Sequence, residues 1–239
     1  MNNKVAAYTA GILALVITET SKSETQAMKT EELSNKQAAI VTIAAFTASG
    51  DLPKLTDALN EGLDAGLTIN EIKEILVQMY AYCGFPRSLN GISTFISVLD
   101  ARQKKGIKDE PGKEASPLPT GKSSVEVGTE NQTKLIGAPA TGKYIAFTPA
   151  IDRFLKGHLF GDIFARDNLD WQSREIATVA ALANLDGVDS QLQSHFKIAL
   201  NTGVTDAQLK GIIGVIEAKV GAKQGGNASE LLSKVAAAK

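Results

Sequence analysis

The sequence contains one cysteine, Cys83, among 239 residues. A single cysteine excludes an intrachain disulfide and any Cys-x-x-Cys pair within this chain. Histidine is almost as scarce, because His158 and His195 are the only two. With two histidines and no second cysteine, a zinc site is not expected, and we predict no metal.

Net charge and aromatic residues are also sparse. The formal net charge is -1 and aromatic residues make up 5% of the chain. Such a chain has no basic field to hold a phosphate backbone and few rings on which bases could stack, so we expect no nucleic-acid partner. Hydrophobic residues at 44% and charged residues at 21% are typical of a globular protein with one large or two smaller domains.

The apolar run near the N-terminus, residues 5–17, is too short to cross a bilayer as a helix. It follows one lysine and precedes the polar stretch "TETSKSETQ", which is the order found in a secretory signal. We therefore expect a signal peptide at residues 1–23, an exported or periplasmic protein and no stable membrane span. A packed N-terminal helix in a cytoplasmic protein is the alternative.

Helical periodicity dominates the rest of the chain, and no strand hairpin is evident. Three capping boxes, each a hydroxyl residue answered by Glu or Gln three positions later, mark helix starts at Ser34, Thr68 and Thr205. Asp170 can cap a helix that begins at Trp171. The sequence therefore predicts an all-α fold.

Two segments of the chain resemble each other. "ALNEGLDAGLTINEIKEIL" (58–76) matches "HFKIALNTGVTDAQLKGII" (195–213) at an offset of 137 residues. One such helical unit cannot bury its apolar face alone, so we expect the two repeats to pair. We assign the first repeat to residues 24–101, the second to 147–239, and a long irregular linker to 102–146.

The second repeat carries the polar set Arg174, Glu175 and His195 on two helices that must turn back on each other. A carboxylate and an imidazole on facing helices can share a proton and form a general acid/base pair. The alternative is structural, because a glutamate near a helix start is favoured by the macrodipole and a helix histidine is often a core residue.

The first repeat carries different polar residues in "YAYCGFPRS" (80–88), and Ala58 stands opposite His195 in the repeat register. Cys83 lies where a helix should stop, since Gly84 and Pro86 follow. It is either a reactive thiol or a small buried hydrophobic residue.

Residues 147–170 lead into the second repeat and place His158, Asp162 and Arg166 at a spacing of four. One interpretation is a solvated helix face with an Asp162–Arg166 ion pair. In the other, Arg166 reaches a pocket and binds an anionic substrate.

These residues carry a resemblance to the carboxymuconolactone decarboxylase family in a tandem form. The segments that carry it are "LFGDIFARDNLDWQSREIATVAALANL", "LQSHFKIALNTGVT" and "LNEGLDAGLTINEIKEILVQMYAYCGFPRSLNG". The resemblance implies two helical repeats, a homo-oligomer such as a trimer or hexamer, and cofactor-free decarboxylation of a carboxylated lactone in aromatic catabolism. It also covers thiol peroxidases of the alkylhydroperoxidase D type, which use a Cys-x-x-Cys after a glutamate; here that place reads "DGVDSQLQSH" and has no cysteine.

The reciprocal loss of polar residues in the two repeats suggests one composite site. We expect His195, Glu175 and Arg174 to be catalytic, with His195 delivering a proton, Glu175 orienting it and Arg174 stabilising an oxyanion. A small carboxylate substrate would be bound by Arg166, Arg87, Tyr82 and Cys83. The alternatives are an antioxidant peroxidase that uses Cys83, with peroxiredoxin activity, and a non-catalytic oligomeric binding protein.

Overall fold

The computed structural model describes residues 33–118 and 120–237, so the signal-peptide prediction for residues 1–23 lies outside the described residues. The described part is helical and contains no strand, which confirms the all-α prediction. Among these residues, no helix has the length and apolarity needed to cross a bilayer. The helices are α2 (Asn35–Ser49), α3 (Leu52–Asp64), α4 (Ile69–Cys83), α5 (Phe85–Lys104), α6 (Ser124–Ile136), α7 (Lys143–Phe147), α8 (Pro149–Phe154), the π-helix η1 (Leu155–Ile163), α9 (Trp171–Leu182), α10 (Asp189–Asn201), α11 (Asp206–Lys219) and α12 (Ala222–Ala237).

The predicted helix starts are those of the structure. The capping boxes at Ser34, Thr68 and Thr205 form in full, and each side chain accepts a hydrogen bond from the backbone three residues on. Asp170 accepts from the amide of Ser173 and caps α9. These caps satisfy amide groups that a helix leaves without an internal partner, so the local sequence fixes where the helices begin.

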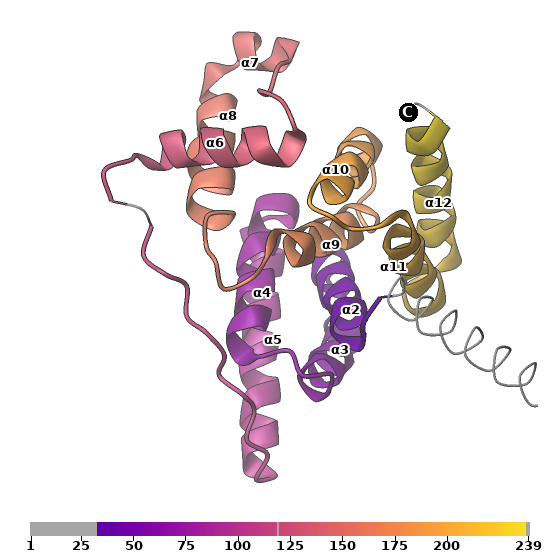
Figure 1. The fold of residues 1–239 in the computed structure, drawn as a ribbon. Coiled ribbons are helices and arrows are strands. Elements are labelled where there is room, and N and C mark those ends of the chain that lie inside the picture. Colours follow the sequence, from indigo (N-terminus) through magenta and orange to yellow (C-terminus); the bar gives the residue numbers. More distant parts are fainter. Residues whose placement is uncertain (1–32, 119, 238–239) are drawn as a thin grey trace, which may run out of the picture.

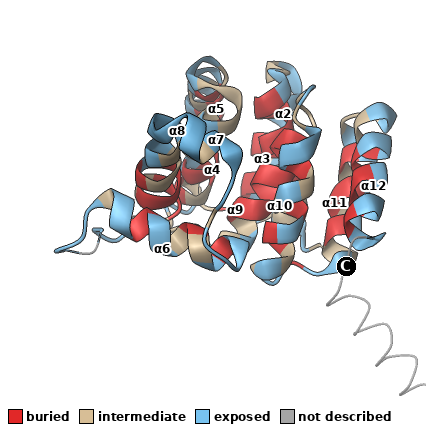
Figure 2. Cartoon of the chain, turned by 90° about the horizontal axis from the view of Figure 1, so that it is seen from above, coloured by how far each residue is buried: buried red, intermediate tan, exposed pale blue. Residues whose placement is uncertain are grey.

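The two repeats, α2–α5 and α9–α12, pack against each other through their first helices. Helix α2 lies along α9, while α4 also contacts α9 and α11 contacts α2 (Figure 1). Ile43 and Ala44 of α2 and Ile176 and Ala180 of α9 are fully buried in one shared hydrophobic core. Burial is concentrated in these inner helices, whereas the outer faces of α5 and α12 are exposed (Figure 2). Pairing therefore buries the apolar faces that a single repeat would leave in water.

The prediction of an irregular linker over residues 102–146 is wrong in part, because this connection contains helices. It contains α6 and α7, and α6 begins at a further capping box between Ser123 and Glu126. Helix α6 packs closely on η1, where glycines at 128 and 161 let the two backbones approach. The buried face of α6 includes Gly128 and Gln132 as well as Val127 and Leu135, so the apolar periodicity that reveals a helix is weak there.

The predicted helical pair between Asp162 and Arg166 does not form. Helix η1 ends at Ile163, so Arg166 lies beyond it. Asp162 instead lies 2.8 Å from Nδ1 of His158 and accepts a hydrogen bond from the hydroxyl of Ser124 at 2.7 Å. The carboxylate therefore stays on the outside of η1, where it binds α6.

Candidate active site

His195 and Glu175 form a hydrogen-bonded pair between α10 and α9. Nδ1 of His195 lies 2.8 Å from Oε2 of Glu175. The carboxylate side chain is completely buried and the imidazole is 12% exposed. A carboxylate only accepts hydrogen bonds, so an ionised Glu175 holds the proton of the ring on Nδ1 and leaves Nε2 of a neutral His195 as an acceptor.

Tyr82 reaches this pair from the first repeat. Its ring meets that of His195 edge-on, with the centroids 5.6 Å apart and an interplanar angle of 81°. Burial raises the pKa of Tyr82, the Glu175 carboxylate raises it further, and Thr178 and Arg174 oppose the increase. The structure thus brings Tyr82, His195 and Glu175 together within one chain, as a composite site requires; their catalytic and binding roles stay predictions.

A second buried cluster lies beside this group and has Glu74 of α4 at its centre. Arg166 Nε donates to both carboxylate oxygens, at 2.8 and 3.0 Å. Nη2 of Arg174 donates to one of them at 3.0 Å and Nδ2 of Asn168 to the other, also at 3.0 Å. Because Arg174 and Glu74 are both nearly inaccessible to solvent, this cluster is an ionic contact inside the interface between the repeats.

Burial and neighbouring charge shift the pKa values of Glu74 and Arg174 in opposite directions. Burial would raise the pKa of Glu74, but the hydrogen bond from Arg166 and the charge of Arg174, with smaller contributions from Asn168, hold that pKa below its ordinary value. Burial lowers the pKa of Arg174, against the pull of Glu74. The carboxylate therefore carries its charge in the folded protein because the two guanidiniums compensate it.

Gln78 extends the polar network of the ionic cluster along α9. Its side chain accepts from Nη1 of Arg174 at 3.1 Å and donates to the hydroxyl of Thr178 at 2.9 Å. Glu74, Gln78 and Tyr82 follow each other at a spacing of four, so they lie on one face of α4. Glu74 and Gln78 are not among the residues predicted from the sequence. Polar residues at a spacing of four in the helix "INEIKEILVQMYAYC" are the signal that could have indicated them.

The remaining predicted site residues are held by other partners. Nη1 of Arg87 donates to the backbone carbonyl of Ala48. The thiol of Cys83 donates to the carbonyl of Met79 at 3.0 Å, and burial raises its pKa from about 9 to about 11 despite the nearby charge of Arg87. Cys83 is half-buried against the shared core. Arg87 and Cys83 thus each donate to a backbone carbonyl, and their roles in substrate binding stay predictions.

An apolar wall adjoins the polar group. Tyr82 packs on a small hydrophobic cluster that is separate from the main core. The buried members of this cluster are Leu135, Leu159, Phe160, Ile163, Phe164 and Ile198. They come from α6, η1, the segment that follows η1, and α10, so the helices of the connection help to enclose the site.

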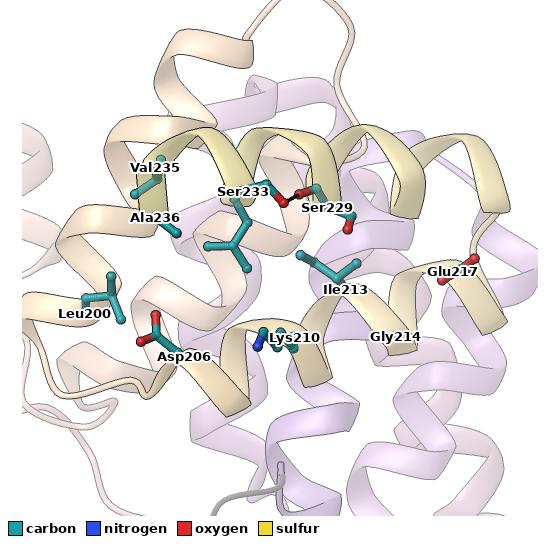
Figure 3. A pocket seen from close by; sticks show the side chains of 11 residues that line it. Leu200, Asp206, Lys210, Ile213, Gly214, Glu217, Ser229, Ser233, Val235 and Ala236 are labelled. Atoms are coloured by element: carbon teal, nitrogen blue, oxygen red, sulfur yellow. Dashed lines mark hydrogen bonds between the residues drawn. The ribbon is translucent and has the colours of Figure 1, made fainter. Parts of the chain in front are cut away.

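Two cavities among the described residues lie outside the group of Tyr82, Glu175 and His195. One cavity of about 680 Å³ lies between α11 and α12. Figure 3 shows its lining, including Lys210, Glu217 and Ser229. Another, of about 400 Å³, is lined by Arg166 and Trp171 among others, between α6 and the start of α9. Neither lining includes Tyr82, Glu175 or His195.

The fold and site define a class of protein: tandem helical repeats that share one core and enclose a histidine–glutamate pair where they meet. The family model described as the carboxymuconolactone decarboxylase family matches residues 20–93 and 149–232. The chain therefore belongs to the carboxymuconolactone decarboxylase family, with one match in each repeat.

A named relative supports the same assignment. The chain is 27% identical over 90 residues to the 4-carboxymuconolactone decarboxylase of Acinetobacter baylyi. The match covers 36% of this chain and spans 66% of the relative's length.

Proposed function

We propose that this protein is a cofactor-independent decarboxylase that acts on a small carboxylated lactone or a related acid. The observation that carries the proposal is the 2.8 Å contact between Nδ1 of His195 and Oε2 of Glu175. It places a titratable ring against a buried carboxylate at the interface between the repeats, with Tyr82 at its edge. Family membership and the name of the relative support the same reaction class.

The proposed reaction needs one proton and a place for negative charge. The bond between the carboxylate carbon and the adjacent carbon breaks, carbon dioxide leaves, and the electron pair moves into a conjugated carbonyl oxygen. Nε2 of protonated His195 then returns a proton to the carbon that lost the carboxylate. The hydroxyl of Tyr82 and Nε of Arg174 are donors that can stabilise the oxyanion formed in between.

The apolar wall favours the departure of carbon dioxide. A carboxylate is strongly hydrated in water, and its charge disperses as the carbon–carbon bond breaks. Phe164 and Ile198 are both buried, and a substrate carboxylate placed against them would lose its hydrating water. The transition state carries a more dispersed charge, so it loses less hydration energy than the bound substrate does.

The test is the replacement His195→Ala in a turnover screen. The screen includes lactones with one carboxylate and with two, as in carboxymuconolactone. Carbon dioxide release from whichever lactone the wild type turns over should fall by roughly a hundredfold or more, the range of a lost general acid. His158→Ala is the matched control, because His158 also pairs with a carboxylate but is exposed. Equal activity of both variants and the wild type would rule out the assigned role and favour a non-catalytic binding protein.

We also propose that the protein is a homo-oligomer, as the family resemblance implies. Phe85, Leu89 and Ile96 are exposed along α5, and Phe147 and Phe154 are exposed on the segment α7–α8. Apolar faces of this kind favour burial against a partner. Light scattering of the purified protein measures the oligomeric state directly, and a monomer at micromolar concentration would contradict the proposal.

A further inference from the structure

Arg166 and Arg174 share a single carboxylate, Glu74. The Nε edge of Arg166 donates to both oxygens of Glu74. Arg174 directs Nη2 to Glu74 and to the carbonyl of Arg166, and Nη1 to Gln78. Arg166 was expected to bind a substrate carboxylate and Arg174 to stabilise an oxyanion, and both have Glu74 as an internal counterion.

The charges of the Glu74 cluster and of Glu175 balance without any ligand, with Arg174 and the two carboxylates buried and Arg166 partly exposed. Arg166 and Arg174 contribute two positive charges, and Glu74 and Glu175 contribute two negative charges. Arg166 additionally lies in the negative field of Glu114 and Asp167, which raise its pKa after the hydrogen bond to Glu74. Protonated His195, the proton donor of the proposed function, adds one positive charge, so the set compensates one substrate carboxylate. A second carboxylate placed near the buried Arg174 would lose water without gaining a free counterion, which is unfavourable.

Three polar atoms of this set remain buried without a hydrogen-bond partner. They are the hydroxyl oxygen of Tyr82, Nε of Arg174 and Oε1 of Glu175. Buried polar atoms in folded proteins are nearly always hydrogen-bonded, so a group left open at a candidate site points to a ligand or a bound water. Two of the open atoms are donors and suit a carbonyl oxygen. The Thr178 hydroxyl lies close enough to act on the hydroxyl of Tyr82 but makes no well-directed hydrogen bond with it.

We propose that Glu74 is a specificity-determining residue that restricts this site to substrates with one carboxylate. It does so by neutralising Arg166 and Arg174, while the carbonyl oxygen of the substrate binds the open donors of Tyr82 and Arg174. The inference rests on the proposed function in using the site around His195. An enzyme whose two arginines had no internal counterion could instead bind a substrate with two carboxylates.

The experiment compares two stable lactones that differ by one carboxylate. The probes are 5-oxotetrahydrofuran-2-carboxylate and 5-oxotetrahydrofuran-2,3-dicarboxylate, titrated calorimetrically into the full-length protein at pH 7. We expect the monocarboxylate to bind at least tenfold more tightly than the dicarboxylate. Equal affinities, tighter binding of the dicarboxylate or binding of neither probe would overturn the proposal.

Two variants change the charge in opposite directions, and each is read as the ratio of the two affinities. Glu74→Gln removes a negative charge and should narrow the monocarboxylate preference several-fold. Arg166→Gln removes a positive charge at a partly exposed position and should widen the monocarboxylate preference. Because this position is partly exposed, the variant can be tested even if Glu74→Gln fails to fold. Glu61→Gln, at an exposed ion pair, should leave the ratio unchanged. A ratio that does not move in Arg166→Gln or in folded Glu74→Gln would contradict the role of Glu74.

Failure of this inference can be told from failure of the proposed function. Binding of the probes does not require turnover, so a monocarboxylate preference can be measured in His195→Ala as well. A protein that prefers the dicarboxylate and loses turnover in His195→Ala refutes the charge argument alone. A protein with the expected preference but without turnover refutes decarboxylation alone.

Discussion

The imidazole of His195 and the carboxylate of Glu175 lie 2.8 Å apart, on helices α10 and α9 of the second repeat. Tyr82 completes the contact from α4 of the first repeat. The corresponding positions of the first repeat carry alanines, Ala39 for Glu175 and Ala58 for His195, and Lys219 stands where Tyr82 stands in the other half. The pairing of the repeats therefore yields one histidine pair per chain and not two.

Replacing Glu175 with glutamine tests whether the carboxylate sets the state of His195. The amide keeps the shape of the side chain but can donate a hydrogen bond to Nδ1, which moves the ring proton to Nε2. His195 would then present a donor where the neutral ring presents an acceptor. We expect Glu175→Gln to lower kcat by roughly a hundredfold, within the usual range for acid–base residues, with a changed pH profile.

The control for this variant is the pair His158 and Asp162, which has the same 2.8 Å contact but lies on the exposed side of η1. Asp162→Asn should leave kcat and the pH profile as they are in the wild type. Circular dichroism melting checks that Glu175→Gln is folded at the assay temperature. A folded Glu175→Gln variant with wild-type turnover would show that the carboxylate is structural.

Glu74→Ala should be strongly destabilising. It removes the shared counterion of two arginines, one of which, Arg174, is completely buried. Breaking a buried ion pair on one side costs about 3–5 kcal/mol, because the remaining charge is left without compensation. Urea unfolding measures this loss as a decrease in the free energy of unfolding.

The pH dependence of that loss has a definite sign. The folded protein lowers the pKa of Glu74, so this carboxylate contributes stability above its ordinary pKa near 4.5 and the contribution disappears as the pH falls through the folded value. The difference between the wild type and Glu74→Ala should therefore shrink below about pH 4.5. Glu61→Ala, which breaks the exposed pair with Lys219, should cost no more than about 1 kcal/mol.

Cys83 should behave as a protected thiol. Burial raises its pKa to about 11 from an ordinary value near 9, and only the thiolate reacts with alkylating agents. At pH 8 the thiolate fraction is then roughly a hundredfold lower than for a free cysteine. Alkylation of the native protein with iodoacetamide, followed by mass spectrometry, should be slower than that of the urea-unfolded chain by a similar factor.

The same residue separates the decarboxylase from the thiol peroxidase. Cys83→Ser retains a hydroxyl that can donate to the carbonyl of Met79, as the thiol does now. We expect this variant to keep the wild-type rate of carbon dioxide release. Peroxide turnover by the wild type that disappears in Cys83→Ser would support the antioxidant alternative instead.

Much of the fold could be predicted from the sequence because its determinants are local or repeated. Capping boxes such as Thr68–Glu71 use residues three apart, and the internal match shows the pairing of the two units. Helix α6 escaped prediction because it is held by backbone contact, with Gly128 lying against the backbone of Lys156. A helix that is buried through glycine leaves little hydrophobic periodicity to detect.

The candidate site was predictable only in part for a similar reason. His195 and Glu175 lie on adjacent helices joined by a short turn, so their meeting follows from chain direction. The partner of Arg166 and Arg174 is Glu74, which is about 100 residues away from Arg174 in sequence. A glutamate in a helix is normally a solvated residue. The spacing of Glu74, Gln78 and Tyr82 marks a polar face of α4, but it does not tell that Glu74 will be buried against an arginine of the other repeat.

The crossing of α6 and η1 gives a final prediction about how the site is enclosed. A Cβ atom on Gly128 would collide with the backbone carbonyl of Lys156 and approach the amide of Gly161. Backbone cannot move aside as a flexible side chain can, so Gly128→Ala should push α6 away from η1 at a cost of about 1–3 kcal/mol. Because Leu135 of α6 belongs to the wall beside Tyr82, hydrogen exchange of α6 should accelerate and substrate affinity should fall.

Gly226→Ala is the matched control for that substitution. Gly226 lies in the exposed part of α12, and a Cβ there would meet no atom within 4 Å. Alanine is the better helix former, so this variant should be as stable as the wild type or more stable, by up to about 1 kcal/mol. Two glycine-to-alanine changes in helices are thus expected to have opposite signs. Equal stability and equal hydrogen exchange in the two variants would show that α6 does not depend on close backbone contact with η1, and that the wall beside Tyr82 is held by side-chain packing alone.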